Sequence, residues 1–157
     1  MAALDRLLIA NVRNMDERHP EDEYALREGM IEGMYAVMTV NHALKNYRFK
    51  DEFPWHLWVD IEIENTVEDG LPDGAEAEIL NGFEDEIHGK LKEVCDILHI
   101  GRMTWNSRRE LFFYLNDPEA AHQTLQAISA GESKREFQYE MSKDSEWARV
   151  NFMFNYE

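Results

Sequence analysis

Residues 98–124 read LHIGRMTWNSRRELFFYLNDPEAAHQT, and this stretch decides the fold of the chain. Gly101 is expected to end a helix, after which two extended runs follow at residues 102–105 and 109–115. Asn106-Ser107 separates the two runs and marks the point where the chain reverses. The second run is apolar on both faces, which predicts a central strand covered on each side.

A helix is predicted on each side of this hairpin. Downstream, Asp117 is expected to cap a helix with Pro118 at its first position, reaching about Ala130. Upstream, Asp73 and Glu76 have the spacing of a capping box and open a helix of about six turns. Its apolar residues recur every three or four positions: Ile79, Leu80, Phe83, Ile87, Leu91, Val94, Cys95 and Leu98.

Two further segments alternate between apolar and polar residues and predict strands. They are residues 57–64 and residues 135–141, the second with a charged outer face that suits a sheet edge. The order from residue 55 to 141 is therefore β-α-β-β-α-β. This order predicts an α+β fold, a ferredoxin-like split βαβ sandwich with both helices on one face of an antiparallel sheet.

The 157 residues fit a single domain. Residues 1–50 form an N-terminal extension, in which positions 4, 7, 8 and 12 have helical spacing and residues 24–40 predict a β-hairpin. Residues 144–157 form a C-terminal capped turn and an alternating tail that could pair with a strand. The helix-free face of the sheet is expected to be partly covered, either by the N-terminal hairpin or by a second copy of the chain.

The net charge of −16 is concentrated in the middle of the chain. Residues 51–100 contain 15 acidic residues against Lys90 and Lys92, a local charge of −13. Phosphates would be repelled by this surface, so direct binding of nucleic acid is not expected. A basic protein partner and simple solubility are the two interpretations of this charge. No signal peptide or membrane span is predicted, and the single cysteine, Cys95, fits a reducing compartment, so a cytoplasmic location is expected.

Six short motifs give the chain a family resemblance. They are Val40-Asn41-x-Ala43-Leu44-Lys45-x-Tyr47, Phe53-Pro54-Trp55, Gly70-Leu71-Pro72, Gly101-Arg102-x-Thr104-Trp105-Asn106, Arg109-Glu110-Leu-Phe-Phe-Tyr and Asp144-x-Glu146-Trp147. With these motifs the chain resembles a bacterial domain-of-unknown-function family, number 695. That family is similar in fold to the regulators of ribonuclease E activity, acidic proteins that restrain an RNA-degrading enzyme by binding it. The resemblance implies the hairpin at residues 24–40 and a role through protein contact, and it implies no catalytic residue. One departure is Asn106-Ser107, where Asn-Gly is expected at the tight turn, so this turn should be longer or strained.

Two groups of residues are candidates for binding. Asp60, Glu62 and Glu64 share one strand face with Trp58, and together they could contact a basic partner. The three carboxylates could instead hold a hard cation such as Mg²⁺ or form a solvated acidic face. Arg108 and Arg109 could clamp a carboxylate or phosphate, or neutralise acidic side chains beside them.

The first functional hypothesis is a non-enzymatic binding or regulatory protein that acts through protein–protein contact. The alternative is a small-molecule-binding protein or an enzyme with a pocket on the helix-free sheet face, built from Arg108 or Arg109, His56 and the tryptophans. A structural homodimer, packed sheet face to sheet face, is the third. The sequence contains no glycine-rich phosphate loop and no metal-ligand spacing among its six histidines, so no cofactor and no metal is expected.

Overall fold

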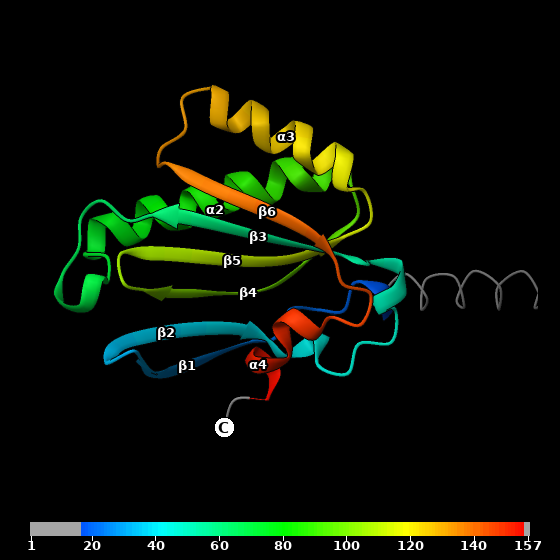
Figure 1. Cartoon of the computed structure of the whole chain (residues 1–157), viewed down its shortest axis with the longest axis horizontal. Helices are drawn as coiled ribbons and strands as arrows, with labels where there is room; N and C mark the ends of the chain where they lie inside the picture. Colours follow the sequence, from blue (N-terminus) through cyan, green and yellow to red (C-terminus); the bar gives the residue numbers. More distant parts are fainter. Residues whose placement is uncertain (1–16, 156–157) are drawn as a thin grey trace, which may run out of the picture.

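The computed structural model describes residues 17–155 and shows an α+β fold (Figure 1). A six-stranded sheet has the order β1-β2-β4-β5-β3-β6, and every pair of neighbouring strands is antiparallel. The strands are β1 (Tyr24–Ile31), β2 (Met34–Asn41), β3 (Trp55–Glu62), β4 (Ile97–Trp105), β5 (Arg108–Leu115) and β6 (Phe137–Lys143). The helices of the described residues are α2 (Gly74–Val94), α3 (Pro118–Ala130) and the short α4 (Asn151–Phe154). Single 3₁₀ turns are η1 (His42–Leu44), η2 (Lys50–Glu52), η3 (Glu68–Gly70) and η4 (Ala148–Val150).

Strand β5 has an apolar core on each of its faces. Leu111 and Phe113 belong to a helix-side cluster that also contains Phe83 and Leu91 of α2. On the other face, Phe112 and Tyr114 belong to a second cluster. The central strand predicted from the apolar run 109–115 is therefore confirmed, because β5 lies between β4 and β3 and both its faces are buried.

The hairpin between β4 and β5 turns through two residues only. Asn106 and Ser107 have positive φ values of 48° and 63°, as a type I′ turn requires. The turn is not lengthened by the serine, because its backbone is held from outside. The Ser107 N–H donates to the Gly70 carbonyl at 3.0 Å, and the Ser107 carbonyl accepts from the Ile63 N–H at 2.9 Å. Gly70 is required here, since a Cβ would lie 2.4 Å from the Ser107 nitrogen.

Both predicted helix starts are confirmed, and one of them has an additional role. Asp117 accepts from the Ala120 N–H at 3.1 Å, and Pro118 occupies the first turn. Asp73 accepts from the Glu76 N–H at 2.8 Å, as in a capping box. The Glu76 carboxylate does not reach back to the cap residue. It accepts from the Glu64 N–H at 2.8 Å and from Arg135, so it joins α2 to the chain just after β3 and just before β6.

The N-terminal hairpin is confirmed, but it lies elsewhere than expected. Strand β2 pairs with β4, from Val37↔Thr104 to Val40↔Gly101, so the hairpin extends the sheet instead of covering its face (Figure 1). The helical spacing noted at positions 4, 7, 8 and 12 lies outside the described residues.

The helix-free face is covered at one end by the C-terminal segment and by the chain around η1 and η2. Val150 and Met153 are buried in the second cluster together with Leu44 and Phe53. The alternating tail predicted after residue 150 is therefore wrong. The spacing of three between Val150 and Met153 places both on the inner side of η4 and α4.

Gly101 is a strand residue and not a helix end, so that prediction is also wrong. Helix α2 ends at Val94, and Ile97 already contributes to the helix-side cluster while Leu98 contributes to the second cluster. The Leu98 side chain continues the helical spacing only by coincidence. Glycine is needed because β2 passes very close, and a Cβ at Gly101 would lie 2.1 Å from the Thr39 carbonyl oxygen.

Replacing Gly101 with alanine is therefore expected to lower the free energy of unfolding by about 2–3 kcal/mol, since backbone must move to relieve the clash. Gly82 is the matched control, because it lies on α2 with no atom within 4 Å of a Cβ. Gly82→Ala should raise stability by about 0.5–1 kcal/mol through helix propensity. Urea unfolding measures both, and equal stabilities of Gly101→Ala and the wild type would refute the close approach.

Candidate functional site

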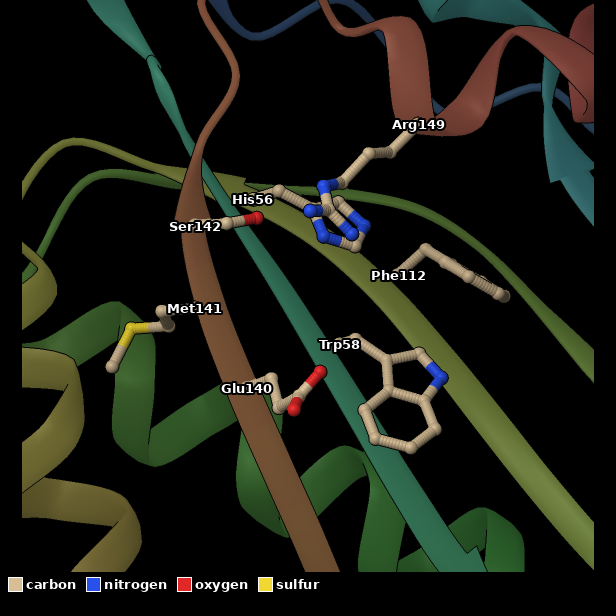
Figure 2. A pocket seen from close by; sticks show the side chains of 7 residues that line it. All are labelled: His56, Trp58, Phe112, Glu140, Met141, Ser142 and Arg149. Atoms are coloured by element: carbon tan, nitrogen blue, oxygen red, sulfur yellow. The ribbon is translucent and has the colours of Figure 1, made fainter.

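A cavity of about 610 Å³ opens on the helix-free face, between the sheet and the C-terminal segment (Figure 2). Strands β3, β5 and β6 contribute His56, Trp58, Phe112, Glu140, Met141 and Ser142, and η4 contributes Arg149. Its volume lies in the range of sites for small ligands. This is the face on which the small-molecule alternative expects a pocket.

Strand register forms the floor of the cavity as two adjacent rows of side chains. In the first row, His56 lies between Ser142 of β6 and Tyr114 of β5. In the second row, Trp58 lies between Glu140 and Phe112. Side chains two residues apart on a strand lie on the same face, so His56 and Trp58 both face the cavity. The alternation predicted for residues 57–64 therefore already begins at His56.

The indole of Trp58 is held in a fixed orientation. Its Nε1–H donates to Glu110 Oε1 at 3.0 Å, and the other Glu110 oxygen accepts from Trp105 Nε1–H at 3.1 Å. One carboxylate therefore anchors two indoles from two strands. Trp58 is only half-buried, which leaves part of a rigid aromatic surface for a ligand.

His56 is the buried polar group of the site. It is 4% exposed, and its Nε2 is buried without a hydrogen-bond partner among the residues that the structure describes. Burial, followed by the nearby charge of Arg149, lowers the His56 pKa from 6.5 to about 4, although Asp144 opposes this. The imidazole is therefore neutral at pH 7, and Nε2 can serve a ligand as donor or acceptor according to its tautomer.

Arg149 brings the positive charge of the cavity. Asp144 fixes the turn that carries it, because its two carboxylate oxygens accept from the Ala148 and Arg149 N–H groups at 3.0 Å each. The hydroxyl of Tyr114 donates to the same carboxylate at 2.6 Å, which joins the turn to β5. The Arg149 side chain is exposed, extends over His56 (Figure 2) and forms no ion pair within residues 17–155.

The acidic residues predicted as a contact surface have different environments. Asp60 is 2% exposed, and its Oδ2 accepts from Arg108 Nε at 2.6 Å and from Gln138 at 3.0 Å. Glu62 is exposed at the end of β3, and Glu64 is exposed but has an oxygen 3.3 Å from Arg135 Nη1. The charge of Asp60 is therefore neutralised by Arg108 and is not exposed to a partner protein. Binding through these residues stays a prediction.

The two adjacent arginines lie on opposite faces of β5, so they do not form a joint clamp. Arg108 pairs with Asp60 on the helix-free face, as in the neutralising interpretation. Arg109 is 4% exposed on the helix side, where it donates to Thr104 Oγ1 at 3.2 Å and to Asn81 Oδ1 at 2.7 Å. Neither arginine lines the cavity, whereas Trp58 and His56 do.

Sequence reasoning missed Arg149, Glu140 and Ser142 as residues of the site. The alternation through residues 135–141 could have placed Glu140 on the face opposite the apolar one. Continued by two residues, the same alternation would have placed Ser142 on that face as well. Arg149 had no such signal, because it enters the site only through the packing of the C-terminal turn.

A second polar cavity, of about 470 Å³, lies between α2 and strands β1, β2 and β4. The Tyr24 hydroxyl bonds His99 Nδ1 at 2.7 Å, and His99 Nε2 lies 3.3 Å from Glu84 Oε1. Arg102 donates to Glu84 at 2.7 Å. The Tyr24–His99 bond joins β1 to β4 and the Arg102–Glu84 bond joins β4 to α2, so both have a structural explanation. His99 Nε2 is buried without a hydrogen-bond partner among the residues that the structure describes.

Residues 17–155 contain neither a metal-binding cluster nor a membrane-spanning helix. No group of three or more His, Cys, Asp or Glu side chains is placed to hold a metal ion. None of the helices in this part of the chain combines the length and the apolar character needed to cross a membrane.

Comparison with known families places the chain. The model of a family of unknown function, DUF695, matches residues 25–154, and the chain belongs to this family. The match includes every strand except the first residue of β1, and it includes all the residues that line the cavity. No curated protein and no solved structure matches the chain.

The His56 environment leads to a pH prediction. An NMR titration of the wild type should show that the His56 imidazole stays neutral until the pH falls to about 4. In Arg149→Gln the His56 pKa should rise toward 6.5, because the adjacent cation is removed. The unfolded chain takes up this proton near pH 6.5, so His56 should reduce stability progressively as the pH falls from 6.5 toward 4. A wild-type His56 that titrates near 6.5 would contradict the buried, neutral ring.

Proposed function

We propose that the protein is a binding protein for a small carboxylate ligand with an apolar part, held in the cavity on the helix-free face. Two groups converge on one cavity, and this observation carries the proposal. Among residues 17–155, the buried His56 nitrogen has no hydrogen-bond partner and the Arg149 guanidinium has no ion pair. An unsatisfied buried polar atom costs free energy, and a ligand that pairs with it recovers that cost.

The chemistry of the walls supports a carboxylate with an apolar body. Arg149 presents the planar donors that match a carboxylate, and His56 Nε2 offers one further polar contact next to it. Trp58 and Phe112 supply apolar area beside these groups. Pockets for small molecules commonly combine such apolar walls with a few placed polar groups.

The test uses 3-phenylpropanoate as the probe in isothermal titration calorimetry. Wild type should bind it saturably with one site, and Arg149→Gln should weaken binding about tenfold or more, because a charge-assisted pair contributes roughly 1.5–3 kcal/mol. Lys143→Gln is the matched control. Lys143 is an exposed cation at the end of β6, opposite Trp55 in the register and outside the cavity lining, so its loss should leave affinity unchanged.

Two results would overturn the proposal. One is the absence of saturable binding by the wild type. The other is an equal loss of affinity in Arg149→Gln and Lys143→Gln, which would mean that overall charge and not the cavity attracts the anion.

Contact with a basic protein is the second candidate, and one observation favours it. Helix α2 carries exposed Glu78, Asp85 and Glu93 on its outer side, within the segment of local charge −13. Such binding would weaken steeply as salt concentration rises. The strand order β4-β5-β3-β6 with α2 and α3 on one face supports, as a further proposal, a ferredoxin-like unit similar to the ribonuclease E regulators. A regulatory role and a cytoplasmic location stay predictions.

A further inference from the structure

We infer that the ligand of this cavity is a zwitterion, a free α-amino acid with an aromatic side chain, whose carboxylate meets Arg149 and whose ammonium meets Glu140. This inference rests on the proposed function and adds to it the second charge of the ligand and the residue that selects it. Three features of the cavity lead to it: its charge balance, the separation of its two charged groups, and its aromatic floor.

The charge balance of the lining favours a ligand without net charge. Among the described residues of the lining, Glu140 and Arg149 are the two charged side chains, one of each sign, and His56 is neutral. A simple carboxylate would satisfy Arg149 but would face the negative Glu140 across the same space. A simple amine would meet the reverse conflict. A zwitterion places a favourable charge at each end, which is how a site discriminates against ligands with one charge only.

The two charged groups of the cavity belong to neighbouring rows of its floor. Glu140 is directly opposite Trp58, whereas Arg149 extends over the neighbouring row that contains His56 and Ser142. The rows are two residues apart along β3, about 7 Å. A ligand that lies across the two rows can therefore direct its carboxylate toward Arg149 and its ammonium toward Glu140. Figure 2 shows the Glu140 carboxylate directed toward Trp58 and the Arg149 guanidinium beside the His56 ring.

The aromatic floor suits the remaining parts of the same ligand. Trp58 is fixed by its hydrogen bond to Glu110 and lies beside Glu140, so its ring face can attract an ammonium group held by that carboxylate. Phe112 lies on the other side of Trp58 and offers an apolar surface to an aromatic side chain. Ser142, beside His56, adds a hydroxyl at the carboxylate end.

The experiment compares three probes that share one skeleton: L-phenylalanine, 3-phenylpropanoate, which lacks the ammonium, and phenethylamine, which lacks the carboxylate. Dissociation constants are measured by calorimetry for wild type, Glu140→Gln, Arg149→Gln and the control Glu132→Gln. Glu132 is an exposed acid in the loop after α3 and outside the cavity lining. Both substituted cavity residues have a side chain that reaches solvent, so the variants are expected to fold, which circular dichroism checks.

Wild type should bind phenylalanine about tenfold or more tighter than either probe with one charge. Glu140→Gln should reduce phenylalanine affinity to that of 3-phenylpropanoate and should improve binding of 3-phenylpropanoate itself, because a repulsive charge is removed. Glu132→Gln should change none of these values. One result would refute the inference and leave the proposed function standing. In it, 3-phenylpropanoate binds through Arg149 as tightly as phenylalanine does, and Glu140→Gln changes the dissociation constant of neither probe. Both fail where none of the three probes binds saturably.

Discussion

Replacing Trp147 with alanine is expected to lower the free energy of unfolding by about 3–5 kcal/mol, the range of large aromatic truncations in a core. Trp147 is 1% exposed and lies in a stack of three rings, between Tyr114 at 4.4 Å and Tyr47 at 5.1 Å between centroids. Its Nε1–H donates to the Phe53 carbonyl at 3.0 Å. The substitution removes the packing and leaves that buried carbonyl without its donor.

The same change should affect the cavity, because Trp147 holds the turn that carries Arg149. Chemical denaturation measures the stability, and calorimetry with 3-phenylpropanoate measures the site under conditions where the variant is folded. Phe152→Ala is the control on the same segment. Phe152 is 47% exposed, and its removal should cost less than about 1 kcal/mol. Similar losses for Trp147→Ala and Phe152→Ala would contradict the role given to the stack.

Glu76→Ala is the second change with a large expected effect, again about 3–5 kcal/mol. Glu76 is fully buried, and its carboxylate accepts from Arg135 Nε at 2.9 Å, from Arg135 Nη2 and from the Glu64 N–H. Removing it leaves the buried Arg135 guanidinium without its main partner, and breaking a buried pair on one side is strongly destabilising. Glu86→Ala is the control, since the Glu86–Lys90 pair is exposed and should contribute less than about 0.5 kcal/mol.

This buried pair also predicts how stability responds to acid. The hydrogen bonds from Arg135 lower the Glu76 pKa from 4.5 to about 2. The folded state therefore binds the proton later than the unfolded chain, so the contribution of Glu76 is complete above about pH 4.5 and is lost as the pH falls toward 2. Denaturation series at several pH values should show this decline in the wild type and a smaller decline in Glu76→Gln. Equal slopes in the two proteins would exclude the pair as the cause.

Local chemistry explains which parts of the fold could be predicted from the sequence. The caps at Asp73 and Asp117 depend on residues that are close together in the chain, and both are present. The apolar run of β5 indicated burial on both faces for the same reason, since its own side chains supply both surfaces. The position of the turn at Asn106-Ser107 could also be predicted, whereas its two-residue form depends on the more distant Gly70 and Ile63.

Features that depend on a distant partner could not be read from the local sequence. Gly101 looked like a helix end, but the contact that requires glycine is with Thr39 of β2, which the local pattern does not reveal. For Arg108 and Arg109 the sequence left two alternatives open, a clamp or neutralisation of adjacent acids, and the Arg108–Asp60 pair agrees with the second. Arg149 is placed at the cavity by the local Asp144 cap together with the long-range stacking of Trp147 on Tyr114 and Tyr47, which the sequence around Arg149 does not reveal.

NMR titration of the Trp58 indole N–H and the His56 ring with 3-phenylpropanoate tests the central claim most directly. Both groups are in the cavity lining, and both are visible without knowledge of the natural ligand. In the wild type, the signals of both residues should shift together and saturate, and the His56 pKa should rise because a carboxylate now lies beside it. In Arg149→Gln the same shifts should require about tenfold more probe. Shifts that are absent from these two residues, or that are unchanged in Arg149→Gln, would contradict a carboxylate site in this cavity.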